Sequence, residues 1–157
     1  MKLLLIRHAD ASSDEPRTLT ETGRRQYTMV ADALRRMGIT VDSLLSSPLL
    51  RALQTAELTS RALGFRGAVE ETPTLGDDFT VDGLLERLAI LPVEATVACV
   101  GHEPHLSRFA AALLTPDGNL SIEVKKSGVI GIQSKGCPAR GNGTLLFVFR
   151  PEDLLRL

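Results

Sequence analysis

Short apolar runs alternate along the chain with segments of helical periodicity, and this alternation is the feature that most constrains the fold. Residues 3–6 form a continuous apolar run, which is typical of a strand covered on both faces. Apolar residues then recur at spacings of three and four from Tyr27 to Met37, which predicts an amphipathic helix that ends at Gly38. Such alternation is typical of an α/β domain.

The same patterns predict further strands and helices. The strands are predicted at residues 41–45, 67–71, 95–100, 124–133 and 144–149. A helix is predicted from residue 48 to 63, with Ser47 as its N-cap and its buried side on Leu49, Leu53, Ala56 and Leu63. Two more helices are predicted near residues 81–88 and 104–113. The 157 residues fit one domain, so we expect a single domain over 1–157.

Composition excludes several classes of function. The net charge of −1 offers no basic excess for a polyanion, so we expect no nucleic-acid partner. The two cysteines have no C-x-x-C spacing and signal neither zinc nor redox chemistry. We find neither a signal-peptide pattern nor a run of about 18 apolar residues, so we expect a cytoplasmic protein without a membrane span.

Basic residues follow three of the predicted strands. Arg7 and His8 follow the first strand, Arg51 lies in the first turn of the helix after the second, and His102 follows the strand at 95–100. In open α/β sheets, ligands bind beyond the carboxyl ends of the strands. These side chains could therefore form one anion site, although histidines at strand ends are also often satisfied by the fold alone.

These residue types suit phosphoryl transfer. An arginine fork matches two phosphoryl oxygens at once. A helix start near Arg51 adds unpaired amides and a positive dipole end. A neutral imidazole is a competent nucleophile, and a covalent intermediate divides the displacement into two steps.

The motifs around these residues resemble those of the histidine phosphatase superfamily. Leu-Ile-Arg7-His8 resembles its Arg-His-Gly signature, Ser-Ser-Pro48 through Arg51-Ala-Leu-Gln-Thr-Ala its second block, and Val-Gly-His102-Glu-Pro its third. The resemblance implies a phosphoglycerate mutase-like fold, which is a three-layer α/β/α sandwich with a mostly parallel sheet. It also implies a metal-independent phosphatase that needs no cofactor.

The short chain and the segment Arg17-Thr-Leu-Thr-Glu-Thr-Gly23 are similar to the SixA-like phosphohistidine phosphatase branch. The resemblance implies that His8 is the phosphorylated nucleophile and that Arg7, Arg51 and His102 bind the phosphoryl oxygens, with Arg17 as an additional contact. It implies a phosphohistidine-bearing protein as substrate, inorganic phosphate as product and a place in signal transduction. We expect a monomer, because a small enzyme with an open pocket can work alone.

Two departures from the family pattern leave questions open. Ala9 replaces the usual glycine after the histidine. The general-acid glutamate of other branches has no clear counterpart, and Glu70, Glu71, Asp77 and Asp78 are the candidates. A missing acid favours a phosphoramidate substrate, because an imidazole leaves more easily than an alkoxide. A small-molecule phosphomonoesterase, a binding protein without turnover and a mutase remain alternatives.

Other polar residues have more than one interpretation. Asp10 could orient a pocket residue or only solvate its loop. Lys125 and Lys126 are interpreted as guards of an edge strand, and Ser127 with Gly128 could approach the phosphate. His102-Glu-Pro-His105 is one residue short of the zinc-protease spacing, so no metal site is predicted.

Overall fold

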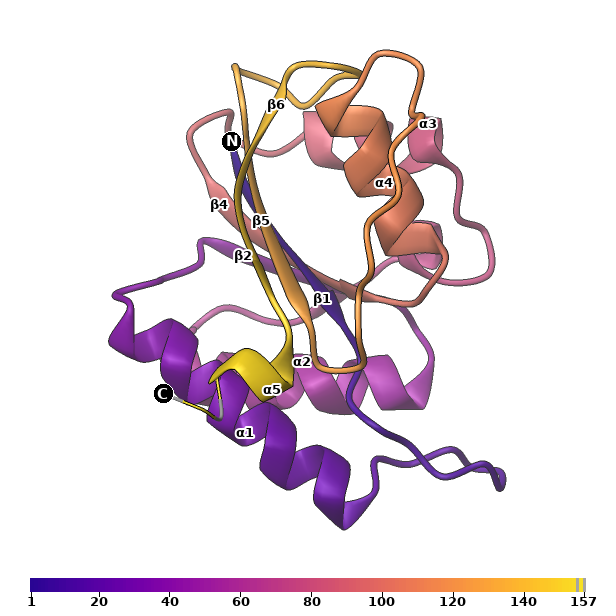
Figure 1. Ribbon diagram of the computed structural model, residues 1–157, viewed down its shortest axis with the longest axis vertical. Coiled ribbons are helices and arrows are strands. Elements are labelled where there is room, and N and C mark those ends of the chain that lie inside the picture. Colours follow the sequence, from indigo (N-terminus) through magenta and orange to yellow (C-terminus); the bar gives the residue numbers. More distant parts are fainter. Residues whose placement is uncertain (155, 157) are drawn as a thin grey trace.

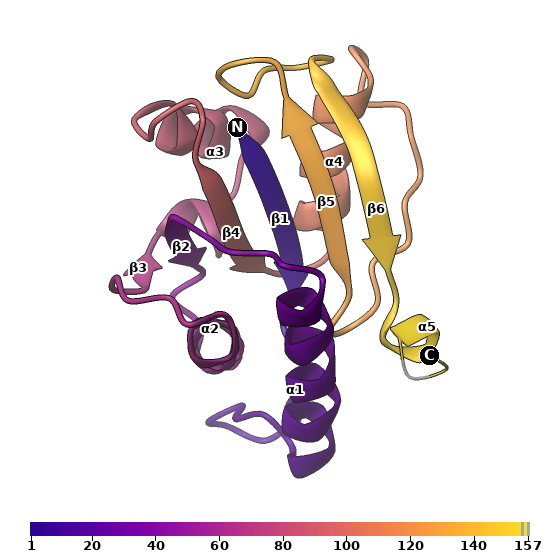
Figure 2. The same cartoon turned by 90° about the vertical axis from the view of Figure 1, so that its left-hand side faces the viewer.

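In the computed structural model, which describes residues 1–154 and 156, a six-stranded sheet lies between two layers of helices (Figures 1 and 2). The strands are β1 (Lys2–Arg7), β2 (Ser43–Ser46), β3 (Glu70–Glu71), β4 (Thr96–Gly101), β5 (Val129–Ser134) and β6 (Gly143–Phe149). The helices are α1 (Glu21–Arg36), α2 (Leu50–Leu63), α3 (Val81–Ala89), α4 (His105–Leu114) and α5 (Pro151–Leu154), with a 3₁₀ turn η1 (Pro73–Leu75).

The sheet has the order β3-β2-β4-β1-β5-β6. The first four strands in this order are parallel to one another, and β5 is antiparallel to both of its neighbours. This arrangement confirms the predicted three-layer α/β/α sandwich with a mostly parallel sheet. None of the helices in the described residues is long and apolar enough to cross a membrane.

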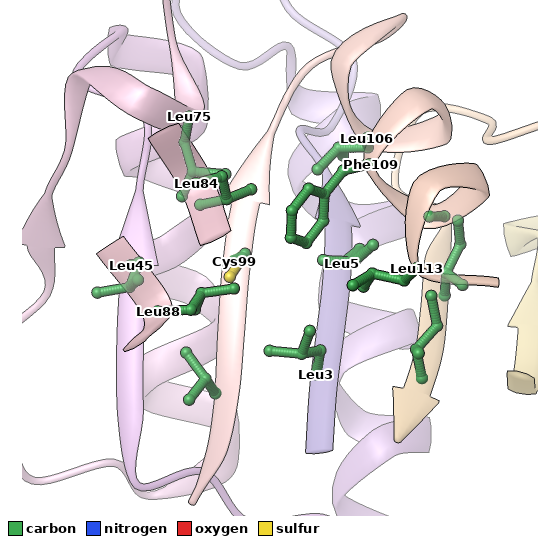
Figure 3. Close-up of a cluster of buried hydrophobic side chains, with 14 of the residues drawn as sticks. Leu3, Leu5, Leu45, Leu75, Leu84, Leu88, Cys99, Leu106, Phe109 and Leu113 are labelled. Carbon is green, nitrogen blue, oxygen red and sulfur yellow. The ribbon is translucent and has the colours of Figure 1, made fainter. Parts of the chain in front are cut away.

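Each face of the sheet carries its own apolar core. Leu3 and Leu5 of β1 point toward α3 and α4, where they pack with Phe109 and its neighbours (Figure 3). Leu4 and Ile6, the alternate residues of the same strand, pack with α1 and α2. Because successive side chains of a strand point to opposite faces, one apolar run serves both cores.

Helix α1 ends before Gly38, as the pattern predicts, and its start is fixed by a side-chain cap that the pattern did not identify. The Thr20 hydroxyl accepts a hydrogen bond from the Gly23 amide at 2.9 Å, and Gly38 follows the last turn with a φ of 77°. The residues that face the sheet are buried, namely Gly23, Tyr27, Val30, Ala31 and Leu34. Met37, predicted on the same side, is half exposed, because the helix has already ended at Arg36.

The buried side of α2 was predicted correctly only at Ala56. Its buried residues are Ala52, Thr55, Ala56 and Thr59, whereas Leu49, Leu53 and Leu63 are only partly buried. The threonines are inside because their hydroxyls have partners there, and Thr59 shares a 2.5 Å hydrogen bond with the Tyr27 hydroxyl of α1. The hydrogen bond between two helices outweighs the apolar preference that the sequence pattern assumes.

The strand predicted at 124–133 begins only at Val129. The residues before it form a loop over the end of β1, where the Lys125 carbonyl accepts from the Gly128 amide at 2.8 Å. The Ser127 amide donates to the carbonyl of His8 at 3.2 Å. Lys125 and Lys126 therefore lie in a loop, and their interpretation as edge-strand guards was wrong.

Gly23 allows α1 to pass directly over the backbone that follows the first strand. A β-carbon at this position would lie 2.3 Å from the Asp10 carbonyl oxygen. Alanine is the better helix former by up to about 1 kcal/mol, but this clash is with backbone that cannot swing away. We expect Gly23→Ala to lower the free energy of unfolding by roughly 2 kcal/mol, net of the helix gain.

Chemical denaturation of wild type and variant measures this difference. Gly64→Ala is the matched control, because Gly64 has a φ of 64° and open space around it. It should lose only about 1 kcal/mol, the cost of a left-handed alanine. Equal losses in the two variants would contradict a steric role for Gly23.

Candidate active site

The parallel register of three strands brings the predicted residues to one edge of the sheet. Arg7 of β1 lies opposite Gly101 of β4, and Ser46 of β2 lies opposite Val100. The residues that follow each strand therefore emerge together. The rings of His8 and His102 lie side by side as a result, with centroids 5.1 Å apart and ring planes at 55°.

The ring of His8 is buried, and its hydrogen bond shows which nitrogen carries the proton. Its Nδ1 lies 2.7 Å from the carbonyl oxygen of Ala9. A carbonyl only accepts, so Nδ1–H is the donor and Nε2 of the neutral ring keeps a free lone pair. That lone pair is the group a nucleophilic histidine needs.

Burial, opposed by the hydrogen bond to Ala9 and aided by the charges of the three arginines, lowers the pKa of His8 from 6.5 to about 4. Burial also lowers the pKa of His102 to about 3, with the charges of His8 and Arg51 as additional causes. Both rings are therefore neutral at pH 7. The site holds uncharged imidazoles among cationic guanidinium groups.

The arginines surround these rings from three segments. The Arg7 guanidinium donates from Nη1 to the Val124 carbonyl at 2.9 Å, and Arg17 donates from Nε to the Ser12 carbonyl at 3.0 Å. Burial lowers the pKa of Arg51, and the charge of Arg17 adds to this effect. The charge of Arg17 lowers the pKa of Arg51 and of both histidines, so Arg17 acts on the site electrostatically.

Several buried polar atoms at this edge have no partner. Among the described residues, the buried side-chain atoms without a hydrogen bond are Arg7 Nε, Arg51 Nε, Arg87 Nη1, His102 Nδ1, His105 Nδ1 and Ser127 Oγ. Three of the six belong to the predicted site. A buried donor without a partner costs about 1–3 kcal/mol, and donors that converge from separate elements indicate an anionic ligand.

Ala9 fits its position without strain. Its side chain is fully buried, and its amide donates to the Thr55 hydroxyl at 3.0 Å. That hydroxyl donates in turn to the Arg51 carbonyl at 2.8 Å. Thr55 therefore connects the segment of the nucleophile to the helix of Arg51, a role that the sequence analysis missed.

The Asp10 carboxylate is engaged by two partners outside the pair of histidines. One of its oxygens accepts from Thr20 Oγ1 and the other from Lys126 Nζ, each at 2.9 Å. These two hydrogen bonds lower the pKa of Asp10. Asp10 thus links its own loop to the start of α1 and to the loop before β5. It orients the backbone of these segments and not a pocket side chain.

The acidic candidates divide into two groups. Glu70 forms an ion pair with Arg87, and Glu71 is exposed on the edge strand β3. Asp77 and Asp78 line a cavity of about 220 Å³ with Pro48, Leu49 and Pro73, directly beside the start of α2. The charge of Asp77 raises the pKa of Arg51 and of His105, so among these four candidates Asp77 is the one that acts on residues of the site.

His105 stacks on Phe79 with ring centroids 4.5 Å apart. Burial lowers its pKa, and the charge of Arg108 contributes to this. In the part of the chain that the structure describes, no three His, Cys, Asp or Glu side chains are grouped as metal ligands would be.

Known proteins share both the sequence and the geometry. A family model described as histidine phosphatase superfamily (branch 1) matches residues 3–81. The chain is 32% identical to the phosphohistidine phosphatase SixA of Escherichia coli K12 over 98% of this chain and 96% of that protein. It is 34% identical to an uncharacterized protein of Picosynechococcus sp. strain PCC 7002 over 99% of both chains.

The structural comparison agrees. A solved structure of the protein histidine phosphatase SixA complexed with tungstate superposes with a TM-score of 0.88 at 28% identity. The match covers 98% of this chain and 99% of that one. The similarity therefore extends over the whole sheet and both helical layers.

The lowered pKa of His8 predicts a dependence of stability on pH. Between pH 6.5 and about 4 the unfolded chain binds a proton on this ring and the folded chain does not. The resulting stability is complete above pH 6.5 and is lost as the pH falls toward 4. From pH 7.5 to 5 the wild type should lose about 2 kcal/mol through His8 alone, and His8→Asn should lack this loss.

Urea denaturation in phosphate-free buffer at several pH values measures the effect. The exposed substitution Ile90→Gln serves as the control and should keep the wild-type dependence. A His8→Asn curve parallel to that of the wild type would mean that His8 is protonated in the folded protein at pH 5.

Proposed function

The chain belongs to the histidine phosphatase superfamily (branch 1) as a phosphatase, and from this premise we propose that it hydrolyses phosphohistidine on a protein. One observation carries the proposal. His8 is neutral, presents a free Nε2 lone pair and lies beside His102, and buried nitrogens of Arg7, Arg51 and His102 have no partner among the residues that the structure describes.

In the first step His8 Nε2 attacks the phosphorus atom. A new P–N bond forms while the P–N bond to the substrate imidazole breaks. The substrate ring, protonated on its second nitrogen, takes the bonding electron pair and leaves as a neutral imidazole. Arg7, Arg51 and His102 hold the equatorial oxygens, with Arg17 as a further contact. Donors fixed before the reaction stabilise the charge on these oxygens without reorganisation.

In the second step water attacks the phosphoryl group on His8. The P–N bond to Nε2 breaks, inorganic phosphate forms, and the imidazole returns to its neutral state. The hydrogen bond from Nδ1–H to the Ala9 carbonyl holds the ring orientation in both steps and stabilises positive charge on the ring while it is phosphorylated.

The nature of the leaving group supports a phosphohistidine substrate. Of the acidic candidates, Glu70 is engaged with Arg87 and Glu71 lies at the exposed sheet edge. An alkoxide leaving group needs a proton from such an acid, worth about 10²–10⁴-fold, whereas an imidazole leaves with less help. The relatives described as phosphohistidine phosphatases agree with this choice.

Further properties remain predictions that accompany the proposal. They are a single domain over 1–157, catalysis without metal or cofactor, a monomeric state, a cytoplasmic location and a part in signal transduction. The phosphorylated protein is the partner, and phosphate is released.

A second function is favoured by one specific feature. The cavity beside α2 is bordered by Asp77 and Asp78, which could donate a proton to an ester oxygen. With such an acid, the protein would be a small-molecule phosphomonoesterase.

The nucleophile can be trapped as a phosphoenzyme. We expect labelled phosphoramidate, quenched during turnover in the presence of EDTA, to leave an acid-labile phosphoryl group on the wild type. His8→Ala should show none, because Nε2 of this ring forms the bond. His105→Ala is the histidine control and should still be labelled.

Each other outcome of the trapping has a meaning. Labelling that survives in His8→Ala would refute the assigned nucleophile. Labelling that is lost with EDTA would refute metal-free catalysis. Phosphate binding without label or release from any donor would make the protein a binding module.

The substrate class is tested by comparing two peptides of the same sequence, one with phosphohistidine and one with phosphoserine. We expect kcat/KM for the phosphohistidine peptide to be higher by about 100-fold. This is the lower end of the rate enhancement that a general acid would give to the ester and that is missing here. Faster turnover of the ester, lost in Asp77→Asn, would establish the monoesterase instead.

A further inference from the structure

Ser47 directly follows β2 and is fully buried, and its hydroxyl contacts His102. Its Oγ is 2.7 Å from His102 Nε2, and it accepts a hydrogen bond from the Leu49 amide at 3.2 Å. The sequence pattern predicted Ser47 as the N-cap of the next helix, but the N-cap residue is Leu49 and has no side-chain cap. The hydroxyl is therefore committed to the histidine and to one local amide.

The direction of the hydrogen bond between Ser47 and His102 follows from what each group needs. If the serine hydroxyl donates, its proton, its lone pair and His102 Nε2 are all satisfied. If it accepted from Nε2–H, its own proton would face a buried environment with no acceptor among its hydrogen-bond partners. Burial of an unpaired donor makes the second arrangement unfavourable.

The other nitrogen of the ring gives an independent indication. His102 Nδ1 is buried and has no partner among the described residues. With Nε2 as acceptor, the neutral ring carries its proton on Nδ1. An Nδ1–H group can donate to a phosphoryl oxygen, whereas an Nδ1 lone pair would repel it.

We propose that Ser47 is a positioning residue that holds His102 in the tautomer with its proton on Nδ1. The role rests on the proposed function, because it matters only if an anion binds beside His102. Ser47 acts through the histidine and does not itself touch the substrate.

The surroundings of Ser47 restrict its hydroxyl. A β-carbon added to Gly76 would lie 3.1 Å from Ser47 Oγ, so the backbone of Gly76 packs against the hydroxyl. In water the neutral histidine side chain favours the tautomer with the proton on Nε2. Without the serine proton, His102 would return toward that form and present a lone pair to the phosphoryl group.

The tautomer can be measured directly by long-range ¹H–¹⁵N spectroscopy. The chain has three histidines, so His8→Asn and His105→Asn assign the spectrum. At pH 7 the wild type should show His102 protonated on Nδ1 and unprotonated on Nε2. In Ser47→Ala the Nε2–H form should become the major one.

Ser46→Ala is the matched control for this experiment. Ser46 is the adjacent serine, is also fully buried, and donates its hydroxyl to the Ser47 carbonyl at 2.9 Å. Its removal costs a comparable hydrogen bond and should leave the His102 tautomer unchanged.

Binding and turnover test the consequence. Ser47→Ala should lower kcat/KM for the phosphohistidine peptide roughly 10-fold and weaken binding of inorganic phosphate, measured by calorimetry, by a similar factor. In the background of His102→Ala, the second substitution Ser47→Ala should have no further effect on kcat/KM.

The outcomes separate this proposal from the proposed function. A wild-type spectrum with the proton on His102 Nε2, or an unchanged tautomer in Ser47→Ala, overturns the role of Ser47. A further loss of kcat/KM in the double variant also overturns it.

The proposed function can fail separately. If the spectra are as expected but the protein neither binds phosphate nor turns over any donor, Ser47 still sets the tautomer of His102, and the proposed hydrolysis of phosphohistidine is refuted.

Discussion

The parallel register of β2, β4 and β1 is the constraint on which the rest of the structure depends. It aligns three strand ends, so that His8, Ser47 and His102 emerge side by side although they are far apart in the sequence. A shift of one residue in either pairing would turn each following side chain to the opposite face. The cores on both faces of the sheet therefore hold the register and, through it, the distance between the two histidine rings.

The site combines features that oppose the stability of the folded protein. The guanidinium groups of Arg7, Arg17 and Arg51 act on the same histidine, and the buried Nε atoms of Arg7 and Arg51 have no partner among the described residues. Burial keeps both imidazoles neutral beside them. A bound phosphoryl group would satisfy the donors and neutralise the positive charge, so the arrangement favours an anionic ligand. Backbone contacts hold this arrangement in place, such as those of Arg7 with Val124 and of Arg17 with Ser12.

The sequence allowed prediction of the layers of the fold and of the residues at the strand ends. Apolar periodicity located β1, α1 and β4 well, because burial alone determines those segments. It was largely wrong about the inner side of α2, where Thr55 and Thr59 are buried by hydrogen bonds to other segments. It also extended β5 too far, because apolar content does not reveal that residues 124–128 bond to the end of β1. The contact between Ser47 and His102 joins residues that only tertiary structure brings together, so no local pattern could predict it.

The central position of β1 also affects the order in which the molecule can assemble. Its two neighbours in the sheet begin at Thr96 and Val129, so no partner for this strand exists until most of the chain has been synthesised. Such non-local pairing is slow compared with helix formation. During translation β1 therefore remains unpaired, with its apolar side chains uncovered, while α1 and α2 can already form. A nascent chain should thus acquire affinity for phosphate only at the end of folding, and the growing polypeptide depends on chaperones or on speed to avoid aggregation.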